Sequence, residues 1–289
     1  MAGRYDDGVD AVSQPVVEVR DLQYAYPDGH PALRGLSFSI ADGETVAIVG
    51  ANGAGKSTIL LHLNGCLMPQ AGTVRIRDLP VSKRTLPDVR RTVGMVFQDP
   101  DDQLFMPTVY EDVAFGPLNL GLPAEEVDRR VMHALSIVGA VHLKDRPPYR
   151  LSGGEKRAVA IASVLSMSPT ILVMDEPTSN LDPQARRRLI ELLKTFEQTI
   201  IVATHDLDMA FDLCARTIVV REGGILADGP SREILQDAVL LAAGHLERPL
   251  RLQGCPVCSP GLASAGRNAV ASHLRPAVDV RAADATSGR

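Results

Sequence analysis

The sequence contains no tryptophan, and aromatic residues make up only 4% of its 289 positions. This scarcity argues against nucleic-acid binding that depends mainly on base stacking. Acidic residues outnumber basic ones by 35 to 30, which gives a formal net charge of -5. That charge argues against a basic surface spread over the whole molecule, although it leaves room for a local basic patch. We therefore expect no nucleic-acid partner.

Long apolar runs are also missing. The longest ones, such as the run from Ala158 to Leu165, fall short of the about 18 residues that a membrane-spanning helix needs. The first residues, MAGRYDDGVDAVSQ, include acidic side chains and no apolar stretch, unlike a secretory signal. We expect a cytosolic chain whose membrane role is peripheral, at the cytoplasmic face of the cell membrane.

Cysteine is scarce, with four residues: Cys66, Cys214, Cys255 and Cys258. We expect reduced thiols and no disulfide framework. Cys66 and Cys214 lie in apolar helical patterns, which predicts that both are buried. Cys255 and Cys258 have C-x-x-C spacing, but one such pair supplies half of a tetrahedral metal site. Metal sensing and incidental tail cysteines both stay open for this pair.

The residues that are present describe an ordinary globular protein, 45% hydrophobic and 22% charged, with enough apolar material for a core. Apolar and polar residues alternate from Val16 to Tyr26, which predicts a half-buried strand ending at the turn 27–29. Leu36 to Ile40 and Thr73 to Ile76 predict similar antiparallel strands. Continuous apolar runs instead predict parallel strands buried on both faces: Thr45 to Val49, Ile171 to Met174 and Thr199 to Ala203.

Helical patterns separate these strands: Ser57 to Asn64, Ala124 to Val138, Glu155 to Leu165 and Pro183 to Phe196. Strands that alternate with helices predict a doubly wound α/β core. Beyond about Leu250 the sequence is rich in Ala, Arg, Gly and Ser with little periodicity, as in a flexible tail. We expect a flexible N-terminus at residues 1–15, one domain at 16–249 and a flexible low-complexity tail at 250–289.

Residues Gly50 to Ser57 fit the pattern G-x-x-x-x-G-K-[ST], directly after the strand TVAIV and before a helical pattern. In this context the N–H groups of the loop and the helix N-terminus bind phosphates, which makes a chance Gly-rich turn a poor alternative. Lys56 can reach the β- and γ-phosphates of ATP, and the Ser57 hydroxyl can ligate Mg²⁺. The predicted nucleotide-binding residues here are Gly50, Asn52, Gly53, Ala54, Gly55, Lys56, Ser57 and Thr58.

An acidic pair follows the second parallel strand. The strand delivers Asp175 to its C-terminal edge, where open α/β sheets bind ligands. Asp175 suits the Mg²⁺ shell, and Glu176 can polarise an attacking water. An acidic pair after a strand is commonly a solvated helix cap. Beside the phosphate loop, we instead predict a metal ligand and a catalytic base.

Leu151-Ser-Gly-Gly-Glu155 precedes a helical pattern, and Ser152, Gly153 and Gly154 can form a second anion site at the helix N-terminus. A Ser-Gly-Gly turn alone is more often a helix cap. Together with the phosphate loop, this segment resembles the signature loop of ATP-binding cassette (ABC) ATPases. The resemblance implies that two protomers pair head to tail, each signature loop closing on the γ-phosphate held by its partner.

Further segments resemble the remaining motifs of this family. Gln98 resembles the Q-loop glutamine that senses Mg²⁺ and the attacking water, which implies that it joins Ser57 and Asp175 as a Mg²⁺ ligand. Ser179-Asn-Leu-Asp182 resembles the D-loop, and His205 resembles the switch histidine that contacts the γ-phosphate. Tyr26 resembles the aromatic residue that stacks on adenine, although a core or turn tyrosine is an alternative. The resemblance therefore implies three catalytic residues, Glu176, His205 and Gln98, and adds Asp182 to the nucleotide site.

This resemblance covers about Val16 to Leu246 and implies a P-loop NTPase fold of the ABC type. Such a fold has an N-terminal antiparallel β subdomain and a helical signature subdomain, here at about residues 99–165. Its ATPase is coupled to transport across a membrane.

The stretch from Val96 to Asn119 closely resembles the ATPases of energy-coupling-factor importers, particularly the cobalt and nickel branch. In that family two ATPases lie beneath a membrane scaffold, and a separate integral subunit captures the substrate. We expect import of cobalt or nickel, driven preferably by a homodimer, with a vitamin importer as the alternative. Apolar residues in this loop-rich stretch are consistent with a docking groove or with packing of the helical subdomain: Phe105, Met106, Pro107 and Phe115.

Other functional classes fit less well. A soluble ABC protein of translation or DNA repair normally has two cassettes or a long coiled-coil insertion, and this sequence has neither. A P-loop small-molecule kinase would share residues 50–57 but has no use for the signature segment or for His205 in this place. Exporter ATPases are usually fused to membrane spans.

Overall fold

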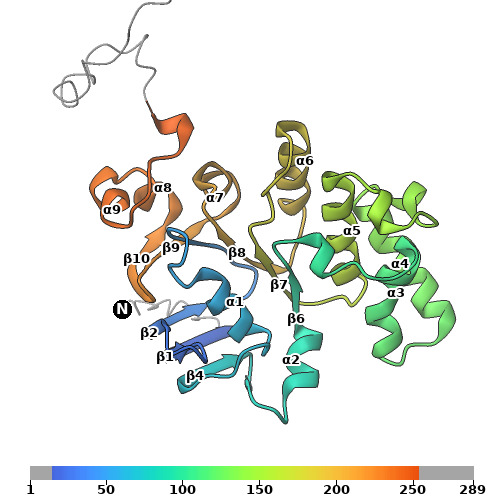
Figure 1. The fold of residues 1–289 in the computed structure, drawn as a ribbon, viewed down its shortest axis with the longest axis horizontal. Coiled ribbons are helices and arrows are strands. Elements are labelled where there is room, and N and C mark those ends of the chain that lie inside the picture. Colours follow the sequence, from blue (N-terminus) through green and yellow to red (C-terminus); the bar gives the residue numbers. More distant parts are fainter. Residues whose placement is uncertain (1–14, 254–289) are drawn as a thin grey trace, which may run out of the picture. The chain divides into compact units, whose positions relative to one another are not determined.

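The computed structural model describes residues 15–253, and their strands form two sheets (Figure 1). The smaller sheet is antiparallel, with the strand order β2-β1-β4-β5. Its strands are β1 (Val17–Ala25), β2 (Pro31–Ile40), β4 (Ala71–Ile76) and β5 (Leu79–Pro80).

The larger sheet has the order β10-β9-β3-β8-β7-β6. Its strands from β9 to β6 run parallel, and β10 is an antiparallel edge strand. The bounds are β3 (Thr45–Val49), β6 (Val93–Val96), β7 (Ile171–Asp175), β8 (Thr199–Thr204), β9 (Arg216–Arg221) and β10 (Gly224–Pro230).

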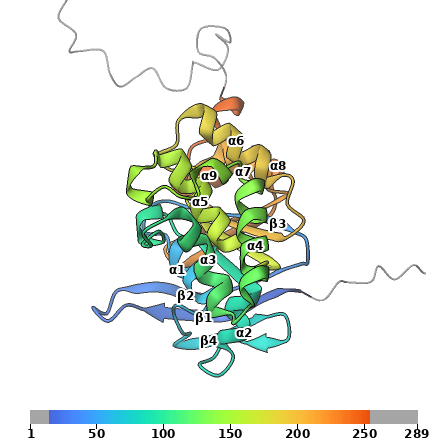
Figure 2. The same cartoon turned by 90° about the vertical axis from the view of Figure 1, so that its right-hand side faces the viewer.

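Helices cover both faces of the larger sheet. The first four are α1 (Lys56–Leu63), α2 (Leu86–Thr92), α3 (Val109–Asn119) and α4 (Ala124–Ile137). The others are α5 (Gly153–Leu165), α6 (Pro183–Leu193), α7 (Leu207–Leu213), α8 (Ser231–Ile234) and α9 (Ala238–Ala243). Short 3-10 helices lie at Pro100–Asp102, Val141–Leu143, Pro148–Arg150 and Leu250–Leu252. Figures 1 and 2 show α3, α4 and α5 grouped beyond the β6 edge, which is the helical subdomain.

Side chains of the parallel strands alternate between two cores because successive residues of a strand point to opposite faces. In β3, Val46 and Ile48 face the core shared with α1 and the antiparallel sheet, whereas Ala47 and Val49 face the core under the other helices. The strands of β7 and β8 divide in the same way. Both faces are therefore apolar, which explains the continuous hydrophobic runs in the sequence.

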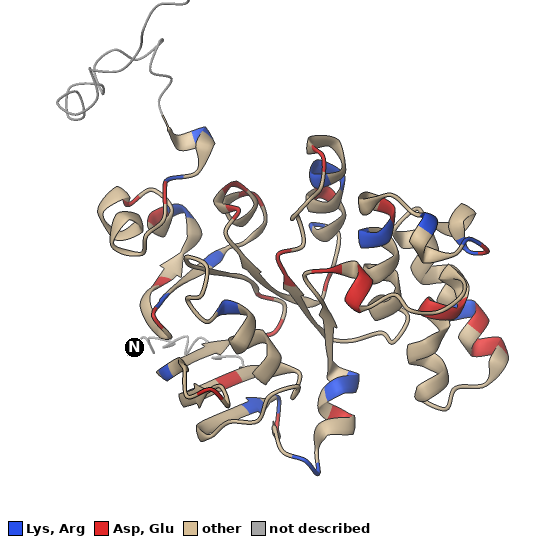
Figure 3. Cartoon of the chain, viewed as in Figure 1, with Lys and Arg blue, Asp and Glu red and all other residues tan. Residues whose placement is uncertain are grey.

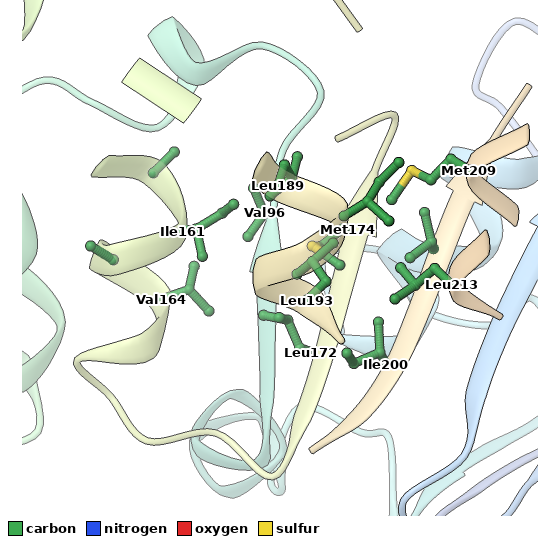
Figure 4. Packing of buried hydrophobic residues seen from close by; sticks show 14 of the residues in the cluster. Val96, Ile161, Val164, Leu172, Met174, Leu189, Leu193, Ile200, Met209 and Leu213 are labelled. Atoms are coloured by element: carbon green, nitrogen blue, oxygen red, sulfur yellow. The ribbon is translucent and has the colours of Figure 1, made fainter. Parts of the chain in front are cut away.

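The second of these cores joins the sheet to the helical side of the molecule. Ile161 of α5 and Leu189 of α6 belong to the same hydrophobic cluster as the strand residues Leu172, Met174 and Ile200 (Figure 4). In Figure 3 the strands of the central sheet are tan along their middles, and charge gathers on helices, loops and strand ends.

The fold class is confirmed: the chain has a P-loop α/β core, an antiparallel β subdomain and a helical subdomain. All predicted strands and helices are present, with ends that shift by a few residues for most and by five for the start of β2. The expected flexible ends, 1–15 and 250–289, fall almost wholly outside the described residues, as do Cys255 and Cys258.

One local prediction is wrong. Cys66 is exposed rather than buried and lies beyond the end of α1 at Leu63, whereas Cys214 is buried as expected. Within the loop-rich stretch, Phe115 lies in α3. That helix starts at a capping box in which Thr108 and Glu111 satisfy each other's backbone N–H groups.

Candidate functional site

Four parallel strands end side by side, and each is followed by a predicted site residue. Strand β8 lies between β3 and β7, and β6 pairs with β7. The loop leading to Lys56 follows β3, Gln98 follows β6, Glu176 follows β7 and His205 follows β8. Because carboxyl ends of parallel strands meet at one edge, residues far apart in the sequence meet here.

The loop between β3 and α1 needs glycine at its two ends. A Cβ on Gly50 would lie 2.3 Å from the carbonyl oxygen of Val220, so the loop leaves the sheet in direct contact with β9. Gly55 has φ +106 and leads directly into α1. No side chain caps the N-terminus of α1, whereas Asp182 and Asp206 cap α6 and α7. The amides of the first turn of α1 are therefore suited to an anion.

The loop forms one wall of a cleft of about 470 Å³. Six of the eight predicted phosphate-loop residues, all except Gly50 and Ala54, line this cleft together with Gln98, Glu176 and His205. His30 and Ala32 also line the cleft, and no motif in the sequence points to either residue. The full lining is Tyr26, His30, Ala32, Asn52, Gly53, Gly55, Lys56, Ser57, Thr58, Gln98, Glu176 and His205.

Lys56 is held inside this wall. Its side chain is only 7% exposed, and Nζ donates to the carbonyl oxygens of Gly50 at 2.9 Å and Ala51 at 3.2 Å. The ammonium lies 3.9 Å from Oε1 of Glu176. Burial lowers the pKa of Lys56, and the charges of Glu176 and Asp175 offset that only in part. An anionic ligand beside Lys56 would therefore stabilise its charged form.

Asp175 carries a buried carboxylate oxygen, Oδ1, without a hydrogen-bond partner among the described residues. Burial raises the pKa of Asp175, against a hydrogen bond from the Ser57 hydroxyl. An orphaned carboxylate oxygen beside a hydroxyl matches the oxygen ligands that Mg²⁺ prefers. Ser57 and Asp175 therefore fit a magnesium ion at the edge of the cleft.

Glu176 is turned toward His205. Its Oε1 lies 2.8 Å from His205 Nδ1 and accepts the His205 backbone N–H at 3.0 Å, while Oε2 accepts the Thr204 hydroxyl at 3.0 Å. The Glu176 backbone has φ +43, a strained conformation for a residue with a side chain. Strain of this kind concentrates at functional sites. The side chain is 7% exposed, so a base here works in a largely desolvated setting.

The segment that carries Gln98 is fastened to helix α5. Arg157 of α5, which is 2% exposed, donates to the carbonyl oxygens of Phe97 at 2.7 Å and Gln98 at 2.6 Å. Gln103 donates from Nε2 to the Ala160 carbonyl at 2.7 Å. Three hydrogen bonds therefore join the segment around Gln98 to the helix that follows the Ser-Gly-Gly turn.

Tyr26 stands at the mouth of the cleft. Its ring is 36% exposed, and its hydroxyl lies 2.9 Å from the Thr58 hydroxyl. The ring of Tyr24 packs edge-to-face against it at 5.2 Å. Tyr24 supports one side of the ring, so Tyr26 can still present an aromatic face to a planar ligand.

The remaining predicted residues lie elsewhere. Ser152, Gly153, Gly154 and Asp182 line a different cleft of about 750 Å³, between the helical subdomain and α6. The Ser152 hydroxyl and N–H both donate to Glu155 at 2.8 Å in a capping box at the start of α5. Within one protomer the structure does not bring this turn to the phosphate loop.

Comparison with known proteins supplies relatives for the whole core. The sequence profile described as "ABC transporter" matches residues 33–179. A putative ABC transporter ATP-binding protein of Geobacter sulfurreducens is 67% identical over 247 residues, 86% of this chain and 99% of that protein. An energy-coupling factor transporter ATP-binding protein, EcfA, of Methanocaldococcus jannaschii is 47% identical over 81% of this chain and 86% of its own length.

Solved structures agree with this picture. CbiO1 of Clostridium perfringens, described as part of the ABC transporter complex cbiONQ, matches with a TM-score of 0.71 and 41% identity. The match covers 79% of this chain and 94% of that one. A post-hydrolysis state of a dimeric ATP-binding cassette, bound to ADP and Pi, matches with a TM-score of 0.68 and 29% identity over 75% and 99% of the two chains.

Two features are absent from the part of the chain that the structure describes. No helix in residues 15–253 has both the length and the apolar character to cross a bilayer. In the same residues, no group of three or more His, Cys, Asp or Glu is placed to hold a metal ion.

Proposed function

The chain belongs to the ABC transporter family as an ATP-binding subunit that hydrolyses ATP, and from this premise we propose that it energises import of cobalt or nickel. The importer is of the energy-coupling-factor type, with this subunit peripheral at the cytoplasmic face of the membrane. The EcfA relative and the CbiO1 structural neighbour support that type of importer. The resemblance of residues 96–119 supports the metal branch.

The convergence of Lys56, Glu176 and His205 in one cleft carries the proposal. Lys56 and the amides of α1 bind the phosphates of ATP, and Tyr26 receives the adenine. Glu176 orients the attacking water, His205 steadies the γ-phosphate and Gln98 senses its state. Ser57 and Asp175 would hold Mg²⁺, which would supply positive charge against the phosphate oxygens when bound.

A second protomer completes the site. The turn at residues 152–154 lies in another cleft of its own protomer, so it closes only on the ATP of a partner. Before closure, the Ser152 hydroxyl and N–H bind Glu155, and the phosphate takes over these donors. We prefer a homodimer, and the dimeric cassette among the structural neighbours supports pairing of this kind.

An exposed aromatic pair offers a docking surface for the membrane scaffold. Phe105 and Phe115 are 62% and 41% exposed, and their rings meet edge-to-face at 5.0 Å. Oδ1 of the buried Asp112 accepts the N–H groups of Phe105 and Met106, both at 3.0 Å, and so fixes the loop. An apolar anchor on a fixed loop is suited to bury against a partner helix.

The substrate is tested by transport. Cells that express the whole transporter should accumulate cobalt or nickel, and replacing Glu176 by Gln should abolish the accumulation. Metal content is read by elemental analysis, and assembly of the complex is checked by co-purification. Accumulation unaffected by the variant in an assembled complex would overturn the metal proposal. Uptake of a vitamin in its place would favour the alternative, in which the same engine serves a vitamin importer.

Phe105→Ser should uncouple ATP hydrolysis by this subunit from transport across the membrane. Truncating an anchor residue of an interface costs about 2 kcal/mol or more, or about 30-fold in affinity for the scaffold. We expect metal uptake to fall at least about 10-fold, while ATPase activity and the melting temperature of the isolated chain stay unchanged. Val239→Ser is the matched control, since Val239 is 81% exposed on α9. Equal uptake by the two variants would contradict the assigned docking surface.

A further inference from the structure

The carboxylate of Asp206 is saturated with donors from three elements. Oδ2 accepts Nε of Arg186 at 2.6 Å and the Thr178 hydroxyl at 3.1 Å. Oδ1 accepts Nη2 of Arg186 at 2.8 Å and the Met209 N–H at 2.9 Å. The guanidinium therefore grips the carboxylate with two parallel bonds, the strongest and most directional form of this ion pair.

Two of these donors, Thr178 and Arg186, lie on either side of segment 179–182. Thr178 lies before the segment 179–182 and Arg186 lies one turn into the helix after it. Asp206 directly follows His205 and caps α7. One carboxylate thus fastens both ends of segment 179–182 to the loop of His205.

A second set of bonds continues from Asp206 to the catalytic base. The Asp206 N–H donates to the Thr204 hydroxyl at 3.0 Å, and that hydroxyl donates to Oε2 of Glu176 at 3.0 Å. The Glu176 backbone leads straight into segment 179–182, with the Ser179 N–H bonded to the Glu176 carbonyl at 3.1 Å. Segment 179–182, the His205 loop and Glu176 are therefore each joined to the other two by hydrogen bonds or by the backbone.

We propose that the Arg186–Asp206 pair is a positioning clamp that makes the placement of His205 and Glu176 depend on segment 179–182. This rests on the proposed head-to-tail dimer, in which a partner protomer presses on that segment. Asn180 is exposed, lines the clefts on both sides of the segment and has φ +61. The segment therefore offers the partner a strained, accessible tip, whose displacement the clamp passes to the hydrolytic residues.

The clamp is built to persist. Arg186 and Asp206 are 29% and 21% exposed, and Thr178 is 8% exposed. Burial by itself raises the pKa of Asp206, but the Arg186 and Met209 hydrogen bonds outweigh it and hold the pKa below its usual value. The pair stays ionised at neutral pH, so it acts as a fixed mechanical link.

Arg186→Ala should separate binding from hydrolysis. Neither Arg186 nor Asp206 lines the cleft that takes ATP, so KM for ATP should stay as in wild type. Hydrolysis needs His205 and Glu176 in place, and misplacement of such groups costs up to about 100-fold, so kcat should fall about 10- to 100-fold. Arg186→Lys keeps the charge without the two parallel bonds and should give an intermediate kcat.

Asp206→Asn guards against a folding defect, because asparagine still caps α7. Combined with Arg186→Ala it should lower kcat no further than the larger single effect, since both changes break one pair. Arg216→Ala is the matched control. Arg216 grips Asp228 at 2.6 Å and 2.7 Å with similar exposure, but the pair joins β9 to β10 away from the cleft. The Arg216→Ala variant should therefore have an altered melting temperature and an unchanged kcat.

Assembly supplies the deciding readout, measured by light scattering with ATP and Mg²⁺ in a Glu176→Gln background. A dimer that persists with Arg186→Ala while kcat falls in the parent background supports the clamp. Loss of the dimer, or an unchanged kcat, overturns it, because the pair would then serve assembly or folding alone. If Glu176→Gln itself forms no ATP-dependent dimer, the proposed function fails, separately from the clamp.

Discussion

Glu176→Gln should bind ATP, nearly stop hydrolysing it and accumulate as a closed dimer. A general base contributes about 100- to 10,000-fold to the rate, so kcat should fall by at least about 100-fold. The amide keeps the shape of the side chain and an acceptor for the Thr204 hydroxyl and the His205 N–H, so the cleft should keep its form. Removing a negative charge beside the phosphates also favours the ATP-bound state. Steady-state turnover and light scattering with ATP measure the two effects.

Glu222→Gln is an informative control. Glu222 shares the left-handed backbone of Glu176, with φ +49 against +43, but lies in an exposed turn between β9 and β10. The same substitution there should leave steady-state turnover unchanged and should not cause a closed dimer to accumulate with ATP. Wild-type turnover in Glu176→Gln would refute the role assigned to this carboxylate. A dead enzyme that stays monomeric with ATP would show that the substitution damages closure as well.

The strands were predicted well from the sequence because apolar runs this short are typical of buried strands, whereas helices need longer patterns. A five-residue run such as TVAIV, buried on both faces, has no room for polar positions, and it became β3. One helix of 11 residues, α3, was missed. Helix α3 carries a capping box at Thr108 and Glu111, a signal present in the sequence but hidden among prolines and aromatic residues.

The candidate site likewise has one part that the local sequence specifies and another part that depends on the fold. Gly50 to Thr58 are neighbours in the chain, so their motif specifies the local loop directly. The ion pair of Arg186 with Asp206 joins residues 20 positions apart. Which of the aspartates at 206, 208 and 212 would face Arg186 depends on how α7 packs against α6, and no local pattern encodes that. Contacts of this kind follow from the fold and become visible only with it.

Lys56→Met should weaken ATP binding strongly without harming the fold. Each hydrogen bond to a charged group contributes about 1.5–3 kcal/mol, so losing the ammonium from two phosphates should weaken ATP by about 100-fold or more. Burial lowers the pKa of Lys56 despite Glu176 and Asp175, so the folded protein holds the proton less favourably than the unfolded chain. Removing the charge therefore does not lower the stability of the ATP-free protein through this group.

A thermal-shift measurement separates these effects. In wild type, ATP with Mg²⁺ at about 100 times its Kd should add about 2.7 kcal/mol, or roughly 5–10 °C in melting temperature. Lys56→Met should melt no lower than wild type without ATP, and its shift with ATP should fall to about 0.4 kcal/mol or less, roughly 1 °C. The control Lys194→Met removes an exposed lysine, paired with Glu191 on α6, and should keep the full shift. A shift retained in Lys56→Met would mean that the loop amides hold the phosphates without this lysine, and the assignment of Lys56 would be wrong.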